Sequence, residues 1–275
     1  MEDLRPFNDT LTTVQNPDAL RTLANLPGIK TIVGGLNPAA VAKDPVSLAK
    51  VAHEMQRFEG QQKAQQVMAS VLRDGDMNQV FGKLDAQGRF TQGALTGKAP
   101  NDVLTYPDRY ALTPPQRAWA DNIRKVGTEI NDFLTRNGVD VNTLPFEEGG
   151  SWVGRRVFSK ADAQGNTIEA AFVGGPGRRP GVRLGMEKTR VFATQEEAIA
   201  AGFKYLPDDQ AMYLNTVGAY NRVAGKQMGD YLLSKLPTRP LAAGESPIFG
   251  EMMGSPIAPS FKGRAFEPGA QQAVK

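Results

Sequence analysis

The stretch from Asp44 to Asp74, DPVSLAKVAHEMQRFEGQQKAQQVMASVLRD, carries the longest helix signal of the chain. Asp44 can accept hydrogen bonds from the free amides of a first turn, and Pro45 has the fixed φ that suits this position. Helical spacing then predicts one shared stripe, formed by Val51, Met55, Phe58, Gln62, Gln65, Val67, Met68, Val71 and Leu72. We expect an amphipathic surface helix or a coiled-coil-like partner helix.

Glutamines are concentrated on this stretch, at Gln56, Gln61, Gln62, Gln65 and Gln66. Such a face fits either solvent exposure or the interface of a helical bundle. The only histidine of the chain, His53, is expected to be an exposed or packed helix residue, because Glu54 follows it without the second histidine of the HExxH zinc pattern.

Further helices are expected on both sides, and each has a start or stop signal. One helix begins at Asn16-Pro17 and ends at Pro27-Gly28. Three others run from Pro114 to Arg136, from Thr194 to Ala200, and from Pro207 to Leu236. Two β-hairpins are also expected. The first joins Val80–Leu84 to Arg89–Ala94, and the second joins Trp152–Ser159 to Thr167–Val173.

These patterns predict an α+β fold that is mainly helical, with two β-hairpins and an extended Pro-rich C-terminal tail. The expected units are an N-terminal helical part with one hairpin (1–104), a helix–hairpin–helix unit (105–236) and a tail (237–275). Six prolines and little periodicity after residue 236 indicate that the tail is extended or disordered.

Composition excludes several classes of protein. The 275 residues include no cysteine, so disulfides, thiolate metal sites and a cysteine nucleophile are ruled out. Glu2 and Asp3 stand where a signal peptide would carry basic and apolar residues, so no signal peptide is expected. No apolar run is long enough to predict a membrane span, and the net charge of +3 does not by itself mark a nucleic-acid-binding protein.

No catalytic apparatus is recognisable, which favours a non-enzymatic protein over an enzyme, and no cofactor or metal is expected. Adjacent carboxylates such as Asp208-Asp209 fit the positive end of a helix dipole better than a catalytic pair. Glu147-Glu148, before a Gly-rich loop, is the best candidate for a carboxylate-based site. The loop at 174–179, GGPGRR, lacks the Gly-Lys-Ser/Thr ending of a phosphate-binding loop.

A basic cluster with interleaved aromatic residues spans 155–190. A hairpin of this kind can contact phosphates and stack bases, although its arginines can equally form a solvated face. The candidate nucleic-acid-binding residues are Arg155, Arg156, Lys160, Arg178, Arg179 and Arg183.

The order of several short motifs carries a resemblance. These are YALTPPQRAW (110–119), EGGSWVGRR (148–156), EKTRVFAT (187–194), EAIAAG (197–202) and GDYLL (229–233). Over about 105–236 this order resembles an internal helical region of the large multidomain "polyvalent" or virion-associated proteins of tailed bacteriophages and prophages. The resemblance implies a phage setting and delivery with the genome, and it supplies no catalytic residue.

Three functions follow as expectations. The first is a structural or scaffold-type module of a phage virion-associated protein, acting through protein partners or self-association in the virion or the host cytoplasm. The second is a module that contacts nucleic acid, such as phage DNA, through the basic hairpin at 155–190. The third is an enzyme of unrecognised type with a carboxylate-based site at Glu147 and Glu148.

Overall fold

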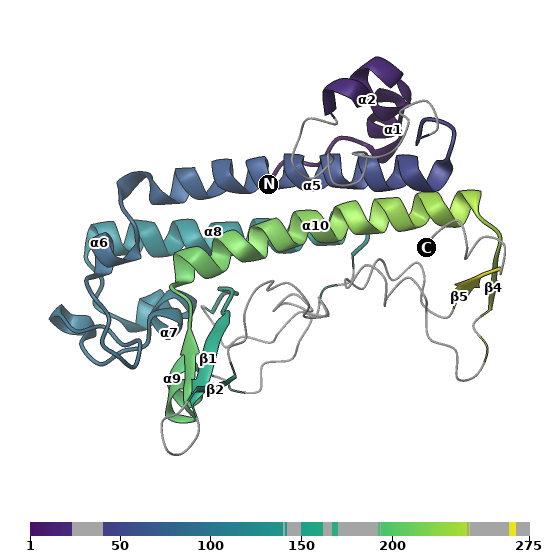
Figure 1. The fold of residues 1–275 in the computed structure, drawn as a ribbon. Helices are drawn as coiled ribbons and strands as arrows, with labels where there is room; N and C mark the ends of the chain where they lie inside the picture. Colours follow the sequence, from purple (N-terminus) through teal and green to yellow (C-terminus); the bar gives the residue numbers. More distant parts are fainter. Residues whose placement is uncertain are drawn as a thin grey trace.

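A computed structural model of the chain shows a mainly helical fold, as expected. The structure describes residues 1–23, 41–139, 141, 150–161, 167–169, 192, 194–240, 242 and 264–267. Three long helices dominate it: α5 (Pro45–Val71), α8 (Pro114–Arg136) and α10 (Asp208–Lys235). Figure 1 shows them lying side by side as the body of the molecule.

Helices α5 and α10 form the most extensive helix pair and run antiparallel. Gly60 of α5 lies against Tyr220 of α10, so closely that a Cβ on Gly60 would clash with the Cβ of Tyr220. Further along the same pair, the side-chain amide of Gln56 donates to the Gln227 Oε1 at 2.6 Å. The small residue at 60 therefore sets the distance between the two helix axes.

The expected start and stop of α5 are confirmed by the structure. Asp44 accepts hydrogen bonds from the amides of Val46 and Ser47, which satisfies two donors that a helix start leaves free. The helix passes into a short 3-10 turn, η1 (Leu72–Asp74), and the chain leaves it at Gly75 with φ of 120°. A positive φ of this kind favours glycine.

Two apolar clusters form the core. The larger one joins α5, α8 and α10, with Met68, Ile123, Phe133 and Tyr220 among its buried members. The smaller one packs α1 (Phe7–Gln15) and α2 (Pro17–Leu23) on the start of α5 and the end of α10. Because the larger cluster combines residues from both sides of position 104, the expected boundary at 104/105 does not divide the core.

Shorter elements gather beyond the ends of the long helices. They are α6 (Met77–Phe81), η2 (Gly93–Leu95), α7 (Pro100–Thr105), η3 (Pro107–Arg109) and α9 (Gln195–Ala200). Strand β1 (Val157–Ala161) pairs antiparallel with β2 (Thr167–Glu169) and with β3 (Phe203–Tyr205), in the order β2-β1-β3. The turn expected at 162–166 lies outside the described residues.

The first expected hairpin differs from the structure. Val80 and Phe81 belong to helix α6, and only one bridge, between Leu84 and Phe90, joins the two segments. The helix forms because Asp76 caps the amide of Gln79, whose side chain in turn accepts from the amide of Asp76. This reciprocal cap overrides the strand propensity of the segment.

The single stripe expected on α5 is also corrected. Val51, Met68 and Val71 are buried, whereas Phe58 and Leu72 are exposed. The expected stripe therefore combined two faces of the helix. Gln56 differs from the other glutamines in being fully buried, where it also donates to the Arg5 carbonyl at 2.7 Å.

The tail expected to be extended or disordered lies largely outside the described residues. Its described parts include two short strands, β4 (Thr238–Pro240) and β5 (Arg264–Phe266), which pair antiparallel.

Candidate functional site

An uncharged surface runs along α5 and into η1. Every exposed residue from position 58 to position 72 lacks a charge, and we call this set the α5 face. Its members are Phe58, Gln61, Gln62, Gln65, Gln66, Ala69, Ser70 and Leu72. A helix surface in contact with water alone usually carries charged side chains, so this face is unusual for a solvated one.

Large apolar side chains stand at both ends of the α5 face. Phe58 is 45% exposed and Leu72 is 36% exposed, and these are the large exposed hydrophobic residues within the described ranges. The other large apolar residues of the described chain are at least partly covered. Burial of an exposed aromatic or aliphatic side chain is favourable, so both ends of the face would gain free energy from a partner.

The two charged residues within this stretch are directed to the N-terminal segment instead. The Glu59 carboxylate accepts from the amide of Arg5 at 3.1 Å. The Lys63 ammonium lies 3.3 Å from the Glu2 carboxylate and donates to the Asp3 carbonyl at 2.7 Å. These contacts hold both charges away from the α5 face.

An apolar groove opens at the Leu72 end of the α5 face, between α5 and the start of α10. Its volume is about 510 Å³. The lining residues are Gln65, Met68, Ala69 and Leu72 on one side and Asp209, Gln210, Tyr213 and Leu214 on the other. Asp209 is the only charged residue in this lining, and no cation within the described ranges forms an ion pair with it.

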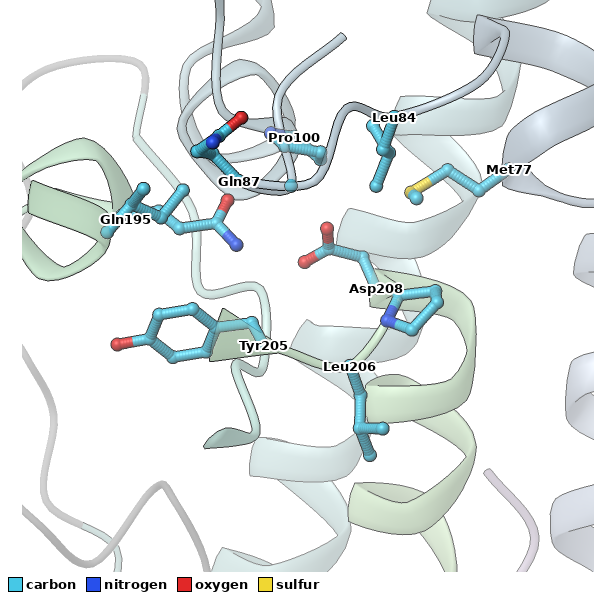
Figure 2. Close-up of a pocket in the computed structure, with 11 residues that line it drawn as sticks. Met77, Leu84, Gln87, Pro100, Gln195, Tyr205, Leu206 and Asp208 are labelled. Carbon is cyan, nitrogen blue, oxygen red and sulfur yellow. The ribbon is translucent and has the colours of Figure 1, made fainter. Parts of the chain in front are cut away.

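A second feature is a buried polar cluster that joins α7, α9 and α10. The Asn101 side chain donates to the Asp208 Oδ1 at 2.7 Å and to the Val153 carbonyl at 3.2 Å. The backbone amide of Asn101 donates to the Gln195 Oε1 at 2.8 Å. Figure 2 shows Asp208 and Gln195 lining a common cavity.

Asp102 contributes to the same cluster by capping α9 from outside that helix. Its carboxylate accepts from the amides of Gln195 at 2.7 Å and Glu196 at 3.0 Å. Burial raises the pKa of Asp102, although these two hydrogen bonds oppose the shift. A tertiary cap of this kind ties α7 to the first turn of α9.

Asp208 is a buried acid near the midpoint of its titration at neutral pH. Its exposed fraction is 2%, and burial raises its pKa to about 7 against the opposing hydrogen bond from Asn101. The cavity beside it has a volume of about 20 Å³, enough for about one water molecule and far below the several hundred Å³ of a substrate pocket. The cluster is therefore built for packing, and it offers no room for a substrate.

The arginines expected to bind nucleic acid are occupied within the fold where the structure describes them. Arg156 is mostly buried and donates to the Asn215 Oδ1 and to the Leu214 carbonyl, both at 3.0 Å. Arg155 donates to the Phe192 carbonyl at 3.0 Å. Both guanidinium groups therefore hold the β1 segment to neighbouring elements, while nucleic-acid contact by these residues stays a prediction.

The remaining predicted residues are placed less fully. Lys160 lies in β1, where its backbone is opposite Glu169 of β2 on one side and Phe203 of β3 on the other. Arg178, Arg179 and Arg183 lie outside the described residues, as do the carboxylates at Glu147 and Glu148.

His53 is packed in the helix, one of the two environments expected for it. Burial, followed by the nearby Arg57 charge, lowers its pKa to about 4. The side chain faces α10, where a Cβ on Gly225 would stand 4.0 Å from the His53 Nε2.

Asn101, Asp102 and Gln195 carry little signal in the sequence, since each is an ordinary polar residue in a short segment. For Asp208, the sequence predicts only an interaction with the dipole of the helix that begins there. Its burial depends on residues about a hundred positions away.

Within the described ranges, no helix is both long and apolar enough to cross a membrane, and no three metal-ligating side chains come together. No protein-family model, curated protein or solved structure matches this chain.

Proposed function

We propose that this chain is a structural or scaffold-type module that acts through protein–protein contacts made by the α5 face. The observation that carries the proposal is the coincidence of an uncharged helix surface with an apolar groove of about 510 Å³. The centre of a protein interface is depleted of charged residues, and aromatic residues and methionine are enriched there. Phe58, Met68 and Tyr213 fit that composition.

The geometry supports this function better than the two alternatives. The small volume beside Asp208 leaves no space for a substrate at that cluster, and Arg155 and Arg156 already bind carbonyl and amide groups of the protein. The carboxylate-based site at Glu147 and Glu148 lies outside the described residues and stays a prediction. Nucleic-acid contact through the basic hairpin at 155–190 stays a prediction. The phage setting is a proposal that rests on the motif resemblance over 105–236.

A charge placed on the α5 face tests the proposal. Ala69→Glu changes an exposed residue of the groove lining, so it should alter stability by no more than about 0.5 kcal/mol while burying an unpaired carboxylate in any complex. The matched control is Lys125→Glu at an exposed position of α8.

The readout is the size of the complexes that contain the tagged chain when cells producing it are lysed and fractionated by gel filtration. We expect the wild type and Lys125→Glu to elute in a complex and Ala69→Glu to elute as a monomer. Elution of all three proteins at the same position would overturn the proposed function. Mass spectrometry of the complex identifies its members.

A further inference from the structure

We propose that the α5 face binds a second copy of the chain, in an antiparallel arrangement that places Phe58 of each copy in the groove of the other. The inference rests on the proposed function and names the partner of the same surface. It follows from the spacing, the symmetry and the charge of the face, in that order.

The spacing of the face matches a helix–helix seam. Phe58, Gln62, Gln65, Ala69 and Leu72 succeed one another at intervals of four, three, four and three residues. Alternation of four and three is the spacing of the a/d positions of two heptads, through which one helix packs on another; here three of the five positions are apolar and two are glutamines. All five side chains are exposed, so within the described part of the chain the seam lacks a partner helix.

The seam is symmetric about Gln65. Phe58 and Leu72 lie seven residues before and after it, so each stands about 10 Å from Gln65 along the helix. A two-fold axis through Gln65 would bring Phe58 of one copy against Leu72 of the other, at both ends. The two Gln65 amides would meet on the axis, and a polar pair in a seam of this kind fixes the register.

The face also holds both halves of a reciprocal contact. A two-fold interface uses the same patch on both copies, so the patch must contain a projecting group and a hollow that receives it. Phe58 is the projecting group, with 45% of its surface exposed. The groove beside Leu72 is the hollow, and Met68, Tyr213 and Leu214 supply apolar walls for an aromatic ring.

Charge favours the same register. Arg57 precedes Phe58, is 46% exposed at its side chain and is paired with Glu54 at 2.7 Å. At 100° per residue, Arg57 projects from the flank of α5 that faces α10. With Phe58 in the groove, it would lie level with Asp209 of the second copy, the only charged residue of the groove lining.

The absence of cysteine from the chain allows this register to be tested by disulfide trapping of the full-length protein. Gln65→Cys places a thiol on the proposed axis and should form a covalent dimer under mild oxidation. A mixture of Gln62→Cys and Ala69→Cys chains, which keep Phe58 and Leu72, should form the mixed dimer faster than either chain pairs with itself. Lys125→Cys, on α8, is the control for random collision.

Light scattering supplies a measurement that needs no disulfide. The wild type should have twice the monomer mass of 29.7 kDa, and Phe58→Ala should weaken the dimer at least about 30-fold, the effect of truncating an aromatic side chain that carries much of an interface's binding energy. Circular dichroism checks that the variant folds.

A monomeric wild type at high concentration, or Gln65→Cys oxidising no faster than Lys125→Cys, would overturn the second-copy proposal. If Ala69→Glu still abolished a cellular complex that contains a different protein, the proposed function would stand and only the identity of the partner would be wrong. If Ala69→Glu left every complex intact, the proposed function itself would fail.

Discussion

Replacement of Asp208 by Asn should remove a pH-dependent cost of folding. The carboxyl has a folded-state pKa of about 7, raised from 3.8 by burial. Because the folded pKa lies above the unfolded one, folding favours the protonated acid. The stability that this group contributes is complete below about pH 4 and is lost as the pH rises to 7.

The magnitude follows from the shift. About three pKa units at 1.4 kcal/mol each give a loss of about 4 kcal/mol between pH 4 and pH 8. Asn is nearly isosteric with the protonated acid, and its Oδ1 can still accept from the Asn101 side chain. Asp208→Asn should therefore match the wild type near pH 4 and exceed its stability by up to about 4 kcal/mol at pH 8.

Urea denaturation followed by far-ultraviolet circular dichroism at several pH values provides the assay. The quantity of interest is the free energy of unfolding of the variant minus that of the wild type, since other titrating groups then cancel. A difference that stays constant from pH 4 to pH 8, or that favours the wild type at pH 8, would show that burial of Asp208 does not raise its pKa.

Three further predictions concern single contacts. Gly60→Ala should cost about 1–3 kcal/mol of unfolding free energy, because the new Cβ would clash with Tyr220 and separate α5 from α10; an unchanged urea midpoint would contradict the close packing. Asp102→Ala should remove the two hydrogen bonds to the Gln195 and Glu196 amides, while Thr194 still caps the Glu197 amide, and cost about 1 kcal/mol, seen as faster amide exchange at Gln195 and Glu196 while α8 is unaffected. His53, whose pKa is lowered to about 4, should contribute stability that is lost as the pH falls from 6.5 to 4; His53→Gln should flatten that part of the pH profile, and a parallel profile would count against a buried neutral imidazole.

The long helices could be predicted from the sequence because their signals are local. The Asp44-Pro45 start of α5 is confirmed by two hydrogen bonds to the Asp44 side chain. Asn137-Gly138, a typical helix stop, ends α8 with Gly138 at φ of 68°. In each case the cap lies within four residues of the groups that it satisfies. The sequence signal and the interaction that it predicts therefore fall within the same short segment.

The errors arose where distant residues decide the outcome. Helical spacing assigned Phe58 and Met68 to one stripe, because spacing alone does not separate apolar residues that lie on two adjacent faces of a helix. Only the packing of α8 and α10 covers Met68 and leaves Phe58 exposed. Likewise, Arg156 reads as a surface cation in a basic run until Asn215 and Leu214 bind it from α10.

The polar cluster around Asp208 shows the same limit. Asn101, Gln195 and Asp208 belong to three short segments or helix ends whose local sequences carry no common motif. Their association depends on how α7 and α9 dock on the start of α10. The uncharged character of the α5 face, by contrast, could be read in part from its glutamines, for which a bundle interface was one of the two expectations.

The most direct test of the central claim, that the α5 face is a protein contact surface, is site-specific photo-crosslinking in the producing cell. A photoreactive amino acid at Gln65 probes the centre of the face, and the same group at Lys125 probes exposed α8. We expect a discrete crosslinked species from position 65 that position 125 does not give. Equal yields from both positions, or no crosslinking from position 65, would contradict it.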